Sequence, residues 1–181
     1  LKTMGGKSSG PDPLRSVISF TKERMLKKQG RKLATIDVHD LICKIWECVV
    51  AGGVRRSALI SLSDLGDVEM RDAKKGPFYF SDPQRSLANN SAVYVEKPTT
   101  EQFLDEWMAL IKSKSGERGI FNRGSLATTV PARRLKYLSK YINNGKMTGP
   151  VGTNPCGEII LQSKQFCNLS EVIARPNDTL Q

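Results

Sequence analysis

The chain has 181 residues, of which 39% are hydrophobic and 25% are charged, a composition typical of a globular domain with a core. It contains no run of about 18 apolar residues, and its first residues lack the apolar segment of a secretion signal, so we expect a cytoplasmic protein without a membrane span. The formal net charge of +10 favours anionic partners such as nucleotides, phosphates or nucleic acid.

The four cysteines have neither the spacing of zinc ligands nor that of a secreted disulfide framework, which predicts a reducing compartment and no metal site. The single histidine, His39, and two of the cysteines, Cys43 and Cys48, fall on one predicted helix. Five residues correspond to about 500° of helix rotation, so the two thiols do not share a stripe. We therefore interpret both cysteines as small buried hydrophobic residues.

Two helices are predicted at the N-terminal end. Asp12 before Pro13 is a favourable helix start, and the first helix should cover residues 14–29 and end at Gly30. The second should begin at Thr35 and end at Gly52. Helical spacing predicts the following inward positions: Val17, Ile18, Met25 and Leu26 on the first helix, and Val38, Leu41, Ile42, Ile45 and Val49 on the second.

The middle of the chain alternates strands and helices. Buried strands are predicted at residues 58–62, 91–95 and 119–121. Between them we expect a short charged helix at 67–75, an aromatic loop at 77–83, and a helix that is capped by Thr99 or Thr100 and buries Trp107. A basic helix is predicted at 133–143, ended by Asn144-Gly145. This order argues for an α/β fold with parallel strand pairs.

The stretch at 152–167, GTNPCGEIILQSKQFC, concentrates reactive side chains. If its backbone is extended, Asn154, Cys156 and Glu158 share one face. Pro155 cannot donate to a sheet ladder, so the tip is better interpreted as a finger-like loop. The polar segment Gln162-Ser163-Lys164-Gln165 is suited to a turn. Gly152 and Gly157 would let a ligand approach the backbone. A thiol beside a carboxylate and an amide indicates redox or radical chemistry at sulfur, with the carboxylate moving a proton.

Asn154-Pro155-Cys156-Gly157-Glu158, followed by Phe166-Cys167-Asn168-Leu169, resembles the active-site finger loop of the adenosylcobalamin-dependent (class II) ribonucleotide reductases, most closely the monomeric ribonucleoside-triphosphate reductases. The resemblance covers nearly the whole chain. It also includes Ser9-Gly10-Pro11, Gly52-Gly53-Val54-Arg55-Arg56-Ser57-Ala58, Pro83-Gln84-Arg85-Ser86, Asn89-Asn90-Ser91 and Gly116-Glu117-Arg118-Gly119-Ile120-Phe121. Each motif is weak alone, but together and in this order they are strongly specific.

The resemblance implies a fold and a domain organisation. The family fold is a ten-stranded α/β barrel whose centre is threaded by the loop bearing Cys156. The chain would form an internal, incomplete part of that catalytic barrel over residues 1–181. Residues 1–61 would include the effector and specificity-loop region, and residues 152–167 the finger loop with the redox cysteine.

The resemblance also implies roles for individual residues. Cys156 would become a thiyl radical that takes the 3′-hydrogen of the ribose, Glu158 would act as general base on the 3′-hydroxyl, and Asn154 would hydrogen-bond the ribose oxygens. Cys167 would belong to a redox-active pair whose partner lies outside this chain. The specificity loop would consist of Gly52, Gly53, Val54, Arg55, Arg56 and Ser57, and substrate contacts would come from Ser8, Ser9, Asn89 and Asn90. Asparagine pairs are also common at turns, so a purely local role for Asn89 and Asn90 is an equal alternative.

The implied cofactor is adenosylcobalamin, with its binding segment largely outside this chain, and no residue here is assigned to cobalt. The implied partners are a ribonucleotide substrate, a deoxynucleotide effector and a thioredoxin-type reductant, but neither a membrane nor a nucleic acid. Three alternatives stay open: a basic nucleic-acid-binding module, a thiol-disulfide protein, and an inactive fragment or subunit of a split reductase. The first lacks a recognisable RNA-binding pattern, and the second lacks a Cys-x-x-Cys motif.

Overall fold

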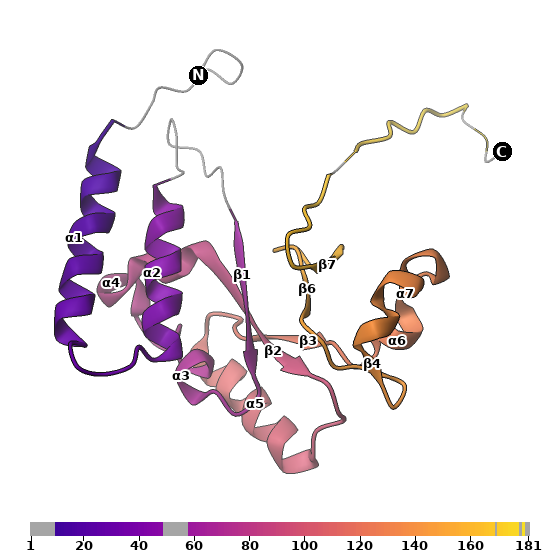
Figure 1. Ribbon diagram of the computed structural model, residues 1–181, viewed down its shortest axis with the longest axis horizontal. Coiled ribbons are helices and arrows are strands. Elements are labelled where there is room, and N and C mark those ends of the chain that lie inside the picture. Colours follow the sequence, from indigo (N-terminus) through magenta and orange to yellow (C-terminus); the bar gives the residue numbers. More distant parts are fainter. Residues whose placement is uncertain (1–9, 49–57, 169, 178, 180–181) are drawn as a thin grey trace.

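The computed structural model describes residues 10–48, 58–168, 170–177 and 179. Two helices, α1 (Asp12–Lys27) and α2 (Thr35–Glu47), lie side by side at one end of the molecule (Figure 1). Between them Gly30 adopts a positive φ of 76°, which agrees with its predicted place after the first helix. None of the described helices is both long and apolar enough to cross a membrane.

A parallel sheet occupies the middle of the molecule (Figure 1). Its order is β1 (Leu59–Asp64), β2 (Ala88–Tyr94) and β3 (Gly119–Asn122). The register aligns Leu59 with Ala88 and Ser91 with Gly119. The predicted parallel α/β arrangement is therefore confirmed for this part of the chain, and β2 is the central strand. The described strands form small sheets and do not close a barrel.

The connections around β2 are short. They contain α3 (Val68–Arg71), α4 (Phe78–Ser81) and a 3-10 helix, η1 (Pro83–Leu87), so the predicted aromatic loop at 77–83 is partly helical. After β2, helix α5 (Thr100–Ser113) begins with a capping box. The Thr99 hydroxyl accepts a hydrogen bond from the Gln102 amide (3.2 Å), and the Gln102 side chain accepts one from the Thr99 amide (3.0 Å). The prediction of a Thr99 cap is confirmed.

The C-terminal part consists of two short helices and two hairpins. These are α6 (Leu126–Thr129), α7 (Ala132–Leu138), η2 (Ser139–Tyr141), the antiparallel pair β4 (Ile142–Asn143) and β5 (Lys146–Met147), and the antiparallel pair β6 (Val151–Thr153) and β7 (Ile160–Gln162). Their core is Leu126, Val130, Leu138, Met147 and Val151. The predicted basic helix at 133–143 is too long, because α7 ends at Leu138. Asn144 and Gly145 have positive φ and form the tight turn of the β4–β5 hairpin instead of ending a helix.

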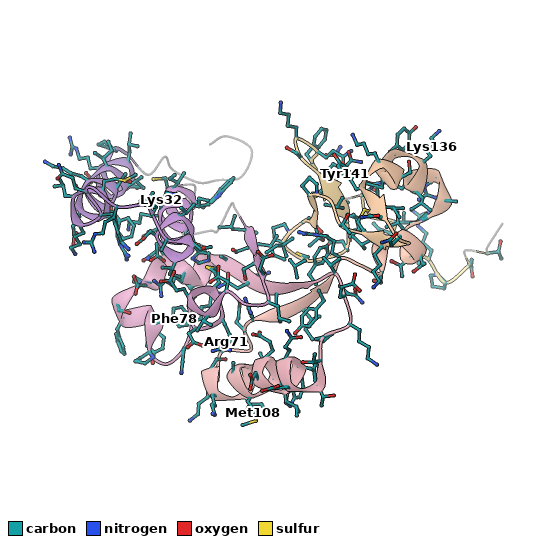
Figure 2. The ribbon with its side chains drawn as sticks, turned by 60° about the horizontal axis from the view of Figure 1, so that its bottom comes forward. Lys32, Arg71, Phe78, Met108, Lys136 and Tyr141 are labelled. Carbon is teal, nitrogen blue, oxygen red and sulfur yellow. The ribbon has the colours of Figure 1, made fainter. Side chains whose placement is uncertain are left out.

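Several predicted core positions are wrong. No residue of α1 is buried, and Ile18 and Leu26 are about as exposed as surface residues, at 59% and 60%. Met25 of α1 is exposed as well, as are Val38, Ile42 and Ile45 of α2, while Val49 lies outside the described residues. Trp107 is 47% exposed, because three short strands offer too little surface to cover α5. Its neighbour Met108 is exposed too and points away from the sheet (Figure 2).

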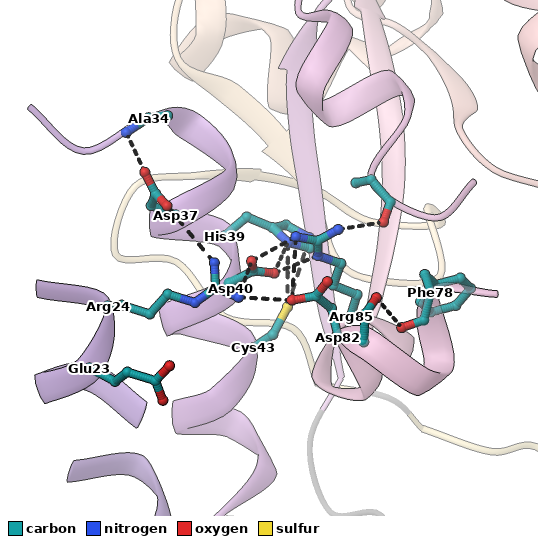
Figure 3. A network of polar contacts seen from close by, with 12 residues as sticks. Glu23, Arg24, Ala34, Asp37, His39, Asp40, Cys43, Phe78, Asp82 and Arg85 are labelled. Atoms are coloured by element: carbon teal, nitrogen blue, oxygen red, sulfur yellow. Dashed lines mark hydrogen bonds and ion pairs between the residues drawn. The ribbon is translucent and has the colours of Figure 1, made fainter. Parts of the chain in front are cut away.

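The buried face of α2 is polar. Its buried residues are Asp37, His39, Asp40 and Cys43. Asp40 is fully buried and accepts two hydrogen bonds from the Arg85 guanidinium, at 2.6 and 2.8 Å, while Arg24 lies 3.3 Å away (Figure 3). Burial alone would raise the pKa of the Asp40 carboxyl, but hydrogen bonds from Arg85 and His39 hold it well below its usual range. A paired charge network therefore joins α2 to η1, whereas the sequence predicted an apolar inward face for the second helix.

The Glu117-Arg118 motif is a second structural network. Arg118 is buried, donates two hydrogen bonds to Glu106 of α5 (3.0 and 2.9 Å), and donates others to Ser63 and to the Leu65 carbonyl at the end of β1. Glu117 accepts hydrogen bonds from Lys74 (2.8 Å) and from the Asn90 amide of β2 (2.6 Å). These contacts fix α5 and the neighbouring strands around β2.

His39 should make stability depend on pH. Burial alone would lower the pKa of His39, but its contacts with Asp40, Cys43 and Asn90 raise the pKa to about 9. Because 9 exceeds the ordinary value of 6.5, protonated His39 stabilises the fold fully below pH 6.5, and this contribution is lost as the pH rises through 9. We expect the free energy of unfolding to fall over that interval with a slope of up to about 1.4 kcal/mol per pH unit.

Urea titrations at a series of pH values would measure this slope, and His39→Gln should flatten it. An equal slope in the His39→Gln variant would show that groups other than His39 cause the pH dependence.

Candidate active site

The finger stretch forms the β6–β7 hairpin, and its tip is a turn rather than an extended strand. Asn154 closes the turn through three hydrogen bonds. Its amide donates to the Ile159 carbonyl (3.1 Å), its side-chain oxygen accepts from the Ile159 amide (3.0 Å), and its carbonyl accepts from the Gly157 amide (3.0 Å). Gly157 has a φ of 89°, a conformation that favours glycine. The prediction of a finger-like loop is confirmed, whereas the condition of an extended backbone is not met.

The three predicted catalytic residues occupy this tip in different environments. Cys156 and Glu158 are both exposed, while Asn154 is 4% exposed and uses its side-chain oxygen to hold the turn. A thiol and a carboxylate thus project from one short turn whose shape is fixed by the neighbouring amide. Such an arrangement can present a sulfur and a proton acceptor to the same ligand.

The hairpin packs against the parallel sheet. Gly152 lies against the Leu62 side chain of β1, so that a Cβ atom at this position would be 3.3 Å from Leu62 Cδ1. What approaches the Gly152 backbone is therefore the sheet, and not a ligand as predicted. Gly157, by contrast, has open space where a side chain would be.

Asn89 and Asn90 connect the central strand to its surroundings. The Asn89 side chain donates a 2.8 Å hydrogen bond to the Pro155 carbonyl, directly before Cys156. Asn90 is buried, and its side-chain oxygen lies 3.1 Å from His39 Nε2. The raised pKa of His39 favours the imidazolium, which would donate this hydrogen bond. The substrate contacts predicted for both asparagines stay a prediction, but in this structure their side chains hold protein groups.

Cys167 follows the hairpin after a turn. The Gln165 amide donates to the Gln162 carbonyl (3.1 Å), and the Gln165 side chain accepts from the Gln162 amide (2.9 Å), which confirms the turn predicted for this polar segment. Cys167 is partly exposed, and all four cysteines are free thiols. Its pairing with a cysteine outside the chain therefore stays a prediction.

Two groups of predicted site residues fall outside the described part of the chain. They are Ser8 and Ser9, and the specificity loop of Gly52, Gly53, Val54, Arg55, Arg56 and Ser57. In sequence, that loop joins the end of α2 to the start of β1, the strand against which the finger hairpin packs.

No cluster of three potential metal ligands occurs among the residues that the structure describes. His39 is the single histidine of the chain, and it is buried against Asn90, Asp40 and Cys43. We assign cofactor binding to none of the described residues.

Comparison with known proteins identifies relatives of the whole chain. It is 33% identical over 171 residues to the adenosylcobalamin-dependent ribonucleoside-triphosphate reductase of Lacticaseibacillus paracasei, which covers 93% of this chain. The chain is homologous to a segment of these reductases. The Lactobacillus leichmannii reductase is also 33% identical, and that of Euglena gracilis is 27% identical over 100% of the chain. The resemblance predicted from the motifs is confirmed.

The match covers only part of each reductase. The chain spans about a fifth of the length of these relatives, 21% for the two bacterial proteins and 23% for the Euglena protein. No family model and no solved structure matches the chain.

Sequence reasoning missed the contacts that support the hairpin. His39 and Asn90 are 51 residues apart, and Asn89 and Pro155 are 66 apart. The available signal was a lone histidine directly before Asp40 in α2, because two adjacent polar residues that become buried need hydrogen-bond partners from other elements.

Asn89→Ala should loosen the tip of the finger hairpin. The substitution removes the hydrogen bond to the Pro155 carbonyl, which we estimate to stabilise the tip by about 0.5–1.5 kcal/mol. We expect faster amide hydrogen exchange at Gly157 and Ile159 and faster alkylation of Cys156, both measured by mass spectrometry.

Ser86→Ala is the matched control, since it removes a similar side-chain bond to a carbonyl, that of Pro83 (2.6 Å), outside the hairpin. Unchanged exchange at Gly157 and Ile159 in Asn89→Ala would mean that the turn is held by its internal bonds alone.

Proposed function

We propose that this chain supplies the catalytic finger loop of a ribonucleotide reductase that converts ribonucleoside triphosphates into deoxyribonucleotides for DNA synthesis. The supporting observation is the pair of exposed side chains, Cys156 and Glu158, on one turn of a segment homologous to such reductases. The segments that the relatives carry outside the matched fifth would be required for turnover, whether in the same polypeptide or as separate subunits.

The radical chemistry would be centred on Cys156. Adenosylcobalamin, the cofactor in the names of the relatives, would supply the radical from outside this chain, and the task of the chain would be to hold the thiol against the ribose. The Cys156 thiyl would take the 3′-hydrogen atom, and Glu158 would accept the proton of the 3′-hydroxyl. Both side chains are exposed at the tip, so both would be accessible to the ribose.

The remaining residues would position the sugar and supply electrons. The Asn154 oxygen is used by the Ile159 amide, so its NH₂ group is the part that would be offered to a ribose oxygen. Loss of the 2′-hydroxyl as water requires two electrons and protons. Cys167 and a cysteine outside the chain would provide them by forming a disulfide, which a thioredoxin-type reductant would reduce again.

The larger assembly is also part of this proposal. The three parallel strands and the finger hairpin would belong to a ten-stranded α/β barrel completed by the missing segments. The loop Gly52–Ser57 would connect a deoxynucleotide effector to the base of the substrate.

Cys156→Ser in the complete reductase should lower deoxynucleotide formation by at least about a thousandfold, because a serine hydroxyl cannot carry the radical. Product formation from a labelled ribonucleotide would be measured by chromatography. Cys48→Ser, which changes a partly buried thiol away from the hairpin, should leave the rate nearly unchanged. Retained turnover in Cys156→Ser would refute the proposal.

Glu158→Gln should lower kcat by about 10²- to 10⁴-fold, which is the usual contribution of a general base. The amide keeps the size of the side chain but cannot accept the proton, and substrate binding should change little. Steady-state kinetics of the complete enzyme would separate kcat from KM. A loss confined to KM would assign Glu158 to binding instead.

A further inference from the structure

The charge of the chain is distributed unevenly. Between Gly119 and Gly157 there is no acidic residue, and the basic residues are Arg123, Arg133, Arg134, Lys136, Lys140 and Lys146. Most of this charge lies on α7 and the segments around it, beside the finger hairpin, where Figure 2 labels Lys136 and Tyr141. The first acidic residue after this stretch is Glu158 itself.

The basic residues of α7 and η2 are not neutralised within the described part of the chain. Arg24, Arg85 and Arg118 all form ion pairs with carboxylates in the N-terminal part, and Lys146 pairs with Glu96. Among the described residues, no carboxylate lies within ion-pair distance of Arg133, Arg134, Lys136 or Lys140. An uncompensated group of this kind attracts anions.

A groove of about 390 Å³ separates α6 and α7 from the finger hairpin. Its lining brings Arg133 and Arg134 together with Thr129 and Glu158 over an apolar floor that includes Val130 and Ile160. The Arg134 guanidinium donates a 2.7 Å hydrogen bond to the Ile160 carbonyl, which holds it on the hairpin. Arg133 is exposed and has no hydrogen-bond or ion-pair partner among the described residues, so all its donors are available.

Guanidinium groups are well suited to phosphate, because their planar donors match two of its oxygens at once. We propose that Arg133 and Arg134 form a binding site for the phosphate chain of a nucleoside polyphosphate in the groove beside Glu158. This inference rests on the proposed function, since it places the phosphates of the substrate on the α7 side of the catalytic hairpin. Arg134, fixed by Ile160, would orient the phosphate chain, and the free Arg133 would close over it.

Titration calorimetry of the chain would test the site with three probes: inorganic tripolyphosphate, ATP and adenosine. We expect tripolyphosphate and ATP to bind and adenosine not to bind. Arg133→Ala should weaken both complexes about tenfold, which corresponds to the loss of one charge-assisted contact. Because the Arg133 side chain contacts no described partner, this variant should keep its fold, which circular dichroism would verify.

Arg31→Ala is the matched control, since it removes one exposed arginine from the connection between α1 and α2. It should leave both affinities within about twofold, because a distant surface charge is largely screened. An equal loss in the two variants would overturn the proposal in favour of non-specific attraction by the net charge. Failure of tripolyphosphate to bind the unmodified chain would also overturn it, as would binding of ATP without tripolyphosphate.

The test separates this site from the proposed reaction. Cys156→Ser should keep the affinity for tripolyphosphate while losing deoxynucleotide formation in the complete enzyme. Binding that depends on Arg133 in a protein without reductase activity would refute only the proposed function. Reductase activity without Arg133-dependent binding would refute only the phosphate site.

Discussion

The buried pair of Asp40 and Arg85 is the interaction on which the rest of the described structure depends. A fully buried carboxylate is tolerated only with charged and hydrogen-bonded partners, and removing one partner typically costs about 3–5 kcal/mol. Arg85 lies in η1, three residues before β2 begins. The ion pair therefore joins α2 to the segment that leads into the central strand, and fixes where that strand starts.

The residues that follow the start of β2 connect this ion pair to the candidate site. Asn90 is held on one side by His39 and on the other by Glu117, whose carboxylate is paired with Lys74. Asn89 contacts the finger tip one residue before Cys156. The position of the thiol is thus set by the internal bonds of the hairpin and also by a strand that begins some 68 residues earlier in the chain.

Local sequence signals predicted the elements whose cause is local. The helix cap at Thr99, the turn after Gln162 and the finger-like loop at Pro155 each depend on a few neighbouring residues, and all three are present. Periodicity failed on α1 and α2, because it locates the apolar face of a helix but not which face is covered. On α2 the covered face is the polar one, since Asp37 and Asp40 pair with basic residues of neighbouring segments. These are Arg24 in α1, Lys28 directly after α1, and Arg85 in η1. The motif at residues 154–158 could be recognised because its members are adjacent in the sequence. The hydrogen bond from Asn89 to the Pro155 carbonyl could not be predicted, because no local rule predicts a contact across 66 residues.

The net charge of +10 can now be divided by function. In the N-terminal part, arginines such as Arg24, Arg85 and Arg118 are paired with carboxylates and hold elements together, so they contribute little to the attraction of ligands. Around α7 no such pairing exists within the described residues, although acidic residues are common elsewhere in the chain.

Concentrated positive charge destabilises a fold by self-repulsion unless something offsets it. In the structure Lys136 and Lys140 lie over the rings of Tyr137 and Tyr141, at 4.8 and 4.9 Å from the ring centroids, which offsets part of this repulsion. Arg133 has no such contact among the described residues, so an anion in the groove would relieve its repulsion most directly, and the same anion would be held beside the Glu158 carboxylate of the hairpin.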